Sequence, residues 1–136
     1  MADPDPHPEN PNHGPVLRLR LVWPGRGMLG PGKADLLALI DETGSISAAG
    51  RAMGMSYKRA WTLVSTLNDM FAEPLVDRAR GGTQGGGAAL TETGRQVLAH
   101  YRSLEASSAQ AGAAPIAALE ALMKPQEAAN DGQKDG

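Results

Sequence analysis

The first regular pattern along the chain is a strict alternation of apolar and basic side chains. Residues 16–23 read VLRLRLVW, in which Arg18 and Arg20 separate aliphatic neighbours. A period of two is typical of a half-buried β-strand. The Pro-Gly pair at 24 and 25 is expected to stop it. The sequence therefore predicts one strand at the start of the folded part.

After this strand the apolar spacing becomes that of amphipathic helices. Ser45 or Ser47 is available to cap the second helix, and Thr91 is expected to cap the fourth. Gly44 ends the first helix, and Pro115 is expected to break the fourth. The predicted helices cover residues 33–42, 45–53, 56–71, 91–111 and, for one or two turns, 116–123.

Two short extended segments, residues 75–79 and 88–90, flank a glycine-rich run at 80–87. Together they predict a β-hairpin with a long, mobile loop. The element order is then strand, three helices, hairpin and helix. That order predicts a mainly α fold with one small β-hairpin.

The two ends of the chain differ in composition from its middle. Residues 1–15 hold five Pro and three acids and almost nothing apolar, which predicts a disordered N-terminal arm. Residues 112–136 predict a short helix followed by a polar tail. The folded domain, with the fourth helix at its end, is expected at 16–111.

The second and third predicted helices have the features of a helix-turn-helix, in which the second helix enters the major groove of DNA. Such a unit needs small residues where its helices cross, and a turn residue that tolerates unusual dihedral angles. Gly54 suits the turn. The small residues are Ala48, Ala49, Gly50 and Ala52.

Opposite faces of the predicted helix at 56–71 differ in chemistry at about 100° per residue. The apolar arc holds Ala60, Val64, Leu67 and Phe71, and the opposite arc holds Lys58, Arg59, Thr62, Ser65 and Thr66. Lys and Arg reach guanine acceptors or phosphates, and hydroxyls contact either bases or phosphates. The polar arc therefore predicts DNA contact, with an ordinary amphipathic surface helix as the alternative.

The glycine-rich hairpin adds to this prediction, because a hairpin after a reading helix can lie along the neighbouring minor groove or backbone. Glycine amides approach phosphates closely, and flanking Arg side chains are placed to contact them. The loop is not a nucleotide-binding P-loop, since no Gly-Lys-Ser/Thr follows it. A spacer without function is the alternative. The candidate contacts are Arg78, Arg80, Gly81, Gly82, Thr83 and Gln84.

The helix at 91–111 is the predicted surface for self-association. Val97, Leu98, Tyr101 and Leu104 give it more apolar area than a small domain needs to close its own core. A two-fold homodimer that reads two half-sites would raise the affinity of a weakly basic module. The alternative is a helix that merely covers the domain.

Composition excludes several classes of protein. The 136 residues include no Cys, which rules out disulfides, thiolate metal sites and a cysteine nucleophile. No apolar run approaches the roughly 18 residues of a membrane span, and the N-terminus does not read as a secretory signal, so a cytoplasmic location without membrane contact is expected. His7, His13 and His100 form no pair suited to proton transfer or metal binding. Neither an enzyme nor a bound cofactor or metal is predicted.

Net charge is −2, which taken alone argues against nucleic acid as a partner. The distribution changes this picture, because residues 16–90 carry nine Lys and Arg against six acids. The middle of the chain is thus mildly basic between two acidic ends. Charge by itself does not decide the partner.

Five segments together resemble a known family: residues 43–47, 54–61, 75–82, 85–91 and Gly94. They are similar to the N-terminal domain of the ModE family of molybdate-responsive transcriptional regulators. That domain is a winged helix-turn-helix related in shape to the DNA-binding domain of LysR-type regulators. The similarity covers about residues 17–110.

The resemblance implies roles for several residues. Ser56, Tyr57, Lys58 and Arg59 would open the recognition helix, and Thr62 would continue its reading face. Residues 80–87 would form the wing, and Trp61 would pack at the boundary between helix and core. The resemblance also implies dimerisation partly through this domain.

Full-length members of this family carry C-terminal molybdate-binding modules as well. No such module is expected in the residues after the Ala-rich helix, so molybdate is considered only as a signal that reaches the chain through a separate sensor protein. Constitutive action and a response to another signal are the alternatives. The leading expectation is a homodimeric, sequence-specific regulator that binds double-stranded DNA, with molybdenum-related genes as candidate targets. The alternative, slightly favoured by the pI of 5.9, is a winged-helix module that binds protein.

Overall fold

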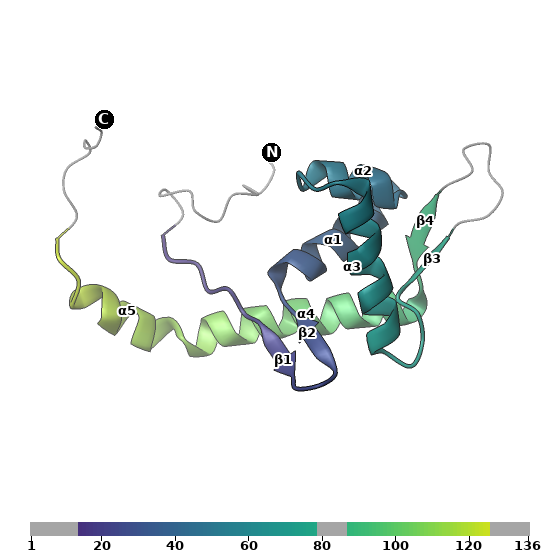
Figure 1. The fold of residues 1–136 in the computed structure, drawn as a ribbon. Coiled ribbons are helices and arrows are strands. Elements are labelled where there is room, and N and C mark those ends of the chain that lie inside the picture. The colour runs from purple at the N-terminus through teal and green to yellow at the C-terminus, as the bar shows by residue number, and fades with distance from the viewer. Residues whose placement is uncertain (1–13, 79–86, 126–136) are drawn as a thin grey trace, which may run out of the picture.

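The computed structural model describes residues 14–78 and 87–125, which form two antiparallel hairpins and five helices (Figure 1). In chain order the elements are β1 (Leu21–Trp23), β2 (Gly27–Leu29), α1 (Pro31–Thr43), α2 (Ile46–Ala52), α3 (Tyr57–Met70), β3 (Val76–Arg78), β4 (Ala88–Leu90), α4 (Glu92–Ala111) and α5 (Ala113–Ala121). The mainly α fold with a small hairpin after the helix-turn-helix is confirmed, and the arrangement is a winged helix-turn-helix.

The prediction of a single strand at 16–23 is wrong in two respects: the strand is shorter, and it has a partner strand. Only residues 21–23 are a strand, and they pair with β2 in an antiparallel hairpin. Pro24 and Gly25 form a tight turn instead of a stop: the Arg26 amide donates to the Trp23 carbonyl at 2.8 Å, and Gly25 has a φ of 77°. Pro followed by a positive-φ Gly is the signature of a type II turn.

Three hydroxyl side chains cap the two helices of the helix-turn-helix and helix α4. Ser45 accepts a hydrogen bond from the Ala48 amide, and Thr91 accepts one from the Gly94 amide. Ser56 likewise accepts from the Arg59 amide at the start of α3. Each bond satisfies an amide that the helix itself leaves without a partner. The predicted caps at Ser45 and Thr91 are confirmed.

The core lies around α1, which contacts α2, α3, α4 and β4. Apart from Tyr101 its buried side chains are aliphatic, as the low aromatic content of the chain requires. They come from every element except β1 and α5 and include Leu29, Leu36, Leu37, Ile40, Ile46, Val64, Leu67, Leu75, Val76 and Leu90.

Helices α2 and α3 cross at very short range, as the small residues predict. Ala49 and Gly50 are buried at the crossing, and a Cβ added to Gly50 would lie 2.8 Å from the Ala60 Cβ. Gly54 makes the turn with a φ of 74°. A larger side chain at Gly50 would push α3 away from α2.

Helices α4 and α5 extend well beyond the rest of the domain (Figure 1). The expectation that a helix begins only after Pro115 is wrong, because α5 starts at Ala113. Pro115 fits in the first turn, where its missing amide has no partner to lose. No residue of α5 is buried. Within the described residues, no helix has the length and apolar character to cross a membrane.

Gly94 provides a test of how α4 packs against the wing. A Cβ at this position would overlap the carbonyl oxygen of Leu75, a backbone atom that cannot move without shifting the segment before β3. Gly94→Ala is therefore expected to lower the free energy of unfolding by at least about 1–3 kcal/mol. Urea denaturation followed by circular dichroism measures this loss.

The matched control is Gly32→Ala, since an added Cβ there meets nothing within 4 Å. This variant is expected to be as stable as the wild type or more so, by up to about 1 kcal/mol. Equal stability of the two variants would contradict the packing described for α4.

Candidate nucleic-acid interface

Helix α3 presents its polar arc to solvent and buries its apolar arc. Ala60, Val64 and Leu67 are at most 1% exposed, and Phe71, just past the helix end, is half-buried. Seven candidate contact residues at and after the start of the helix are exposed: Ser56, Tyr57, Lys58, Arg59, Thr62, Ser65 and Thr66. The division of faces predicted from helical spacing is therefore present in the structure.

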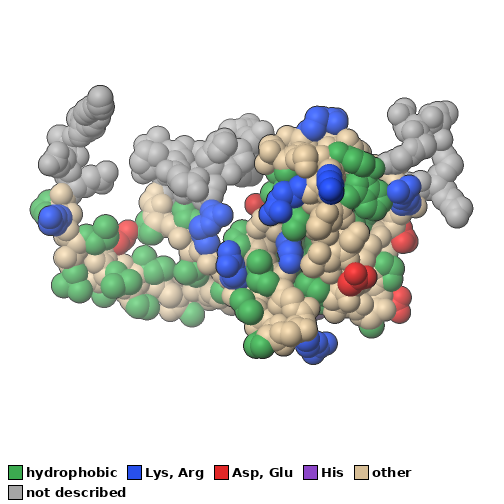
Figure 2. Space-filling model, viewed as in Figure 1, with side chains coloured by type: hydrophobic (Ala, Val, Ile, Leu, Met, Phe, Trp, Pro, Cys, Tyr) green, Lys and Arg blue, Asp and Glu red, His purple; other side chains and the backbone are tan. Residues whose placement is uncertain are grey.

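The cations of this face are not neutralised by described carboxylates. Within residues 14–78 and 87–125, the ion pairs are formed by Arg95 and Arg102, so neither Lys58 nor Arg59 belongs to one. Figure 2 shows Lys and Arg side chains across the centre of one face of the molecule, with Asp and Glu mainly toward its right-hand side. The positive charge is available to an anionic partner.

The threonine hydroxyls of α3 use their protons inside the helix. Thr62 Oγ1 donates to the Lys58 carbonyl at 2.9 Å, and Thr66 Oγ1 donates to the Thr62 carbonyl at 3.0 Å. Their oxygens keep free lone pairs, which suit donors such as the amino groups of adenine and cytosine in the major groove. The face thus combines cationic donors with neutral acceptors.

The wing joins α3 along one edge of this face. Strands β3 and β4 pair in antiparallel register, with Val76 opposite Leu90 and Arg78 opposite Ala88. The guanidinium of Arg78 stacks over the Trp61 ring at 4.7 Å, and Tyr57 meets the same ring edge-on at 6.0 Å. Trp61 is half-buried, so the base of the wing and the first turns of α3 are held together through its ring.

Residues 79–86 lie outside the two described ranges. The candidate contacts that fall there are Arg80, Gly81, Gly82, Thr83 and Gln84.

Asn68 positions the wing, although it was not among the residues predicted from the sequence. Its Oδ1 accepts from the amides of Leu75 and Val76 at 2.8 and 3.1 Å, and its Nδ2 donates to the Val76 carbonyl at 3.2 Å. One side chain near the end of α3 thereby fixes where β3 begins. The available sequence signal was a polar residue at the edge between the polar and apolar arcs of α3. Helical periodicity, however, does not indicate which groups such a side chain hydrogen-bonds.

Backbone bonds fix the other side of the wing. The Ala88 amide donates to the Gly44 carbonyl at 2.9 Å, and the Thr91 amide donates to the Leu75 carbonyl at 2.9 Å. The hairpin is therefore tied to the end of α1 as well as to α3. The strands that carry the loop have a defined position relative to the polar face of α3.

The predicted dimer surface on α4 needs one correction. Tyr101 is only 2% exposed, and its hydroxyl donates to the Leu19 carbonyl at 2.6 Å. Burial raises the pKa of this hydroxyl. The ring belongs to the chain's own core because the segment before β1 covers it. Val97 and Leu98 are half-buried against that core, whereas Leu104 remains 37% exposed.

An apolar groove of about 210 Å³ lies beside Leu104, between β1, β2, the end of α3 and α4. Trp23 lines it and is itself 37% exposed. Elsewhere in the described ranges, no three His, Asp or Glu side chains come together as metal ligands would. The structure thus offers a charged surface on α3 and an apolar one on α4.

Comparison with protein families identifies the class of this domain. Residues 33–95 match the family described as bacterial regulatory helix-turn-helix protein, lysR family. This range runs from the first turn of α1 through the wing to the first turn of α4. The matched part of the chain is therefore similar to the helix-turn-helix domain of LysR-family bacterial regulators.

Within that class the chain is similar to proteins named for molybdenum. It is 48% identical over 82 residues to the molybdenum-pterin-binding protein MopB of Rhodobacter capsulatus, covering 60% of this chain and 30% of that protein. It is 41% identical over 71 residues to the DNA-binding transcriptional dual regulator ModE of Escherichia coli K12, covering 52% and 27%.

MopA of Rhodobacter capsulatus is 40% identical over 96 residues, which cover 71% of this chain and 36% of that protein. The resemblance to ModE-type regulators is confirmed. The aligned regions span about a third or less of these relatives.

Asn68 supplies a test of the link between α3 and the wing. Asn68→Ala leaves the Leu75 and Val76 amides without their acceptor, so a loss of about 1–3 kcal/mol in the free energy of unfolding is expected. Asn68→Asp keeps both acceptors but places a carboxylate oxygen against the Val76 carbonyl in place of the donated bond, so a loss of stability is expected for this variant as well. Chemical denaturation of both variants measures these losses.

Asp69→Ala is the control, because Asp69 is the exposed neighbour on the same helix. Its effect is expected to stay within about 0.5 kcal/mol. If Asn68→Ala were as mild as this control, the side chain would not be holding β3.

Proposed function

We propose that the chain is a sequence-specific transcriptional regulator that binds double-stranded DNA, with α3 as its recognition helix. The observation that carries the proposal is the exposed arc of α3, where Lys58, Arg59 and Thr62 face solvent while the opposite arc is buried. A helix with one side fixed in a core and the other side cationic can enter the major groove without unfolding.

The wing is proposed to contact the DNA next to the groove that α3 enters. Its support is the rigid link from α3 to β3 through Asn68 and through the stacking of Arg78 on Trp61. Arg78, at the end of β3, is the described residue at which a backbone contact is proposed. The same role is proposed for Arg80 and for residues 81–84 of the loop.

A homodimer is proposed on the basis of exposed apolar side chains on α4, on α5 and just after α5. Leu119 on α5 is 64% exposed, and Leu122 and Met123 after its end are 84% and 67% exposed. Leu104 on α4 lies beside the apolar groove. Because no residue of α5 is buried, this helix gains little stability from packing within its own chain. Its apolar side chains therefore favour packing against a second copy of the chain. Two copies would read two half-sites in one operator.

The targets are proposed to be genes connected with molybdenum, because the relatives are named for molybdenum or as ModE. Any response to molybdate is proposed to pass through a separate sensor protein. A cytoplasmic location follows from the proposed action on bacterial DNA. In domain terms we propose that 16–111 is the DNA-binding unit, ending where Gly112 separates α4 from α5.

The recognition face is tested by Lys58→Ala and Arg59→Ala. If the side chain contacts bases, each variant is expected to bind a duplex selected from a random pool more weakly by about 1–3 kcal/mol. Each is also expected to have a weaker preference for that duplex over an unrelated one. A side chain that contacts phosphate instead weakens binding on both duplexes alike. Fluorescence anisotropy titrations measure all of these effects.

Lys124→Ala is the matched control, since it removes an equal charge from an exposed residue beyond α5. It should leave the affinity nearly unchanged. If both α3 variants bind like the control, the assignment of this face to DNA fails. Binding of the chain to a protein partner with little salt dependence, and no binding to duplex, would support the interaction-module alternative.

The dimer surface is tested by Leu104→Glu. A charge placed in an apolar interface is expected to raise the dimer dissociation constant at least tenfold, or about 1.4 kcal/mol. Sedimentation equilibrium measures this constant. Ser103→Glu adds the same charge at the adjacent exposed position and is expected to leave the dimer intact. A wild-type chain that is monomeric with and without DNA would refute the dimer.

A further inference from the structure

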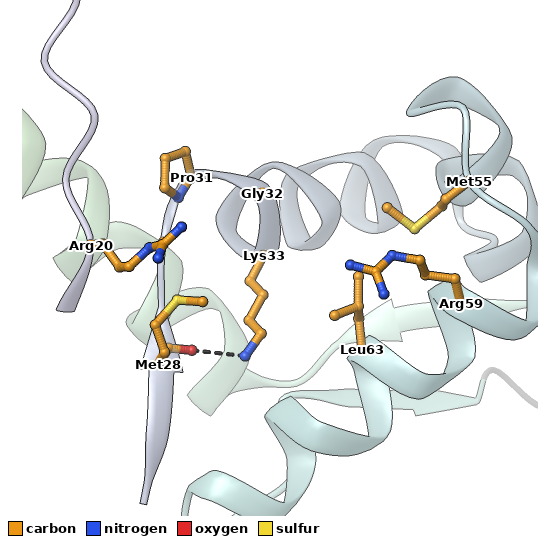
Figure 3. A pocket seen from close by; sticks show the side chains of 9 residues that line it. Arg20, Met28, Pro31, Gly32, Lys33, Met55, Arg59 and Leu63 are labelled. Carbon is orange, nitrogen blue, oxygen red and sulfur yellow. Dashed lines mark hydrogen bonds between the residues drawn. The ribbon is translucent and has the colours of Figure 1, made fainter. Parts of the chain in front are cut away.

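A second basic site lies on the opposite edge of α3 from the wing. Arg20 precedes β1, Lys33 lies in the first turn of α1, and Arg59 lies in the first turn of α3; all three line one open cleft of about 210 Å³. Figure 3 shows Arg20 and Arg59 on opposite sides of the space below the start of α1, with Lys33 between them. Three segments far apart in sequence thus bring three cations together.

The charge in this cleft is not balanced from within it. No carboxylate is among the described residues that line it, and none of its three cations belongs to an ion pair with a described carboxylate. Its other walls are Met28, Met55, Leu63 and the Gly30–Gly32 backbone. Like charges held together without a counter-ion repel one another, so an anion bound there would lower the free energy.

Two of the three cations are constrained by contacts within the chain. Lys33 Nζ donates to the Met28 carbonyl at 2.9 Å, and burial lowers the pKa of this amine. The stem of Arg20 lies against the start of α1, where a Cβ added to Gly30 would be 3.6 Å from Arg20 Cγ. A partly desolvated ammonium group favours an anionic partner over bulk solvent.

The backbone adds donors at the same place. Helix α1 begins with Gly30 as a cap that supplies no side-chain acceptor, followed by Pro31 and Gly32, and its first turn contains no acid. The first amides of a helix carry partial positive charge, and the lack of a side chain at the exposed Gly32 lets an anion approach them. These donors supplement the cationic side chains, which are the primary evidence.

We propose that this cleft binds a tetrahedral oxyanion, as presented either by a phosphate of the DNA backbone or by a free inorganic oxyanion. Arg20 and Arg59 would bind the oxyanion from opposite sides of the cleft, and Lys33, which lies between them, would add a third positive charge. The backbone source rests on the proposed function, because Arg59 belongs both to this cleft and to the first turn of α3. A phosphate bound here would fix α3 from the edge that the wing does not reach.

The experiment uses the full chain and removes one cation of the cleft. Arg20→Ala is the test variant, because Arg20 is exposed and lies outside α3. Arg26→Ala is the matched control, since Arg26 lies in the turn of the same hairpin and does not line this cleft. Affinity for a selected and an unrelated duplex is measured by anisotropy over a series of salt concentrations.

If the anion is a DNA phosphate, Arg20→Ala weakens binding to both duplexes alike. The slope of log affinity against log salt then falls in magnitude by about one, while Arg26→Ala keeps the wild-type slope. In a second arm, nitrogen-15 spectra of the protein without DNA are followed during titration with inorganic phosphate. Saturable shifts at the Gly32 and Lys33 amides, lost in Arg20→Ala and kept in Arg26→Ala, identify a free oxyanion instead.

Either of these results supports the proposal and names the source of the oxyanion. If wild type binds duplex and Arg20→Ala matches the control in both arms, the cleft binds no oxyanion and the proposal is overturned, while the proposed function stands. If wild type binds no duplex, the proposed function fails, and the phosphate arm alone decides whether the cleft is an anion site.

Discussion

Helices α2 and α3 cross at very short range, and this crossing sets the position of α3. Gly50 lets the Ala60 Cβ approach so closely that the two helices share one buried seam. With the helices packed in this way, Val64 and Leu67 of α3 are buried in the core, and the opposite arc of α3 lies in solvent. A helix fixed at this distance and angle presents its cations as a rigid surface. Binding to DNA then requires little further ordering of its backbone.

The exposed arc of α3 lies between two differently built edges. On one edge, Asn68 and the stack of Arg78 on Trp61 fasten the wing. On the other edge, Arg59 faces Arg20 and Lys33 across an open cleft. Positive charge therefore extends beyond the helix on both sides, although the whole chain has a net charge of −2. The distribution of charge, and not its total, suits this domain to DNA.

Local sequence information predicted the helix-turn-helix well, because helical period, caps and turn glycines are properties of neighbouring residues. Contacts between distant residues were not predictable in this way. The position of Tyr101 on α4 gives no sign that Leu19 covers it, 82 residues away. Strand β2 was missed because it has only three residues and Pro24-Gly25 also reads as a terminator. The bonds of Asn68 and the cleft at Arg20 likewise arise only in the folded chain.

In the proposed complex, the exposed arc of α3 faces duplex DNA. A structure of the chain bound to a duplex selected from a random pool tests this arrangement. We expect α3 to lie in the major groove, with Lys58, Arg59 and Thr62 against base edges or phosphates. A complex in which the duplex contacts another surface, with Lys58 and Thr62 still in solvent, would contradict it.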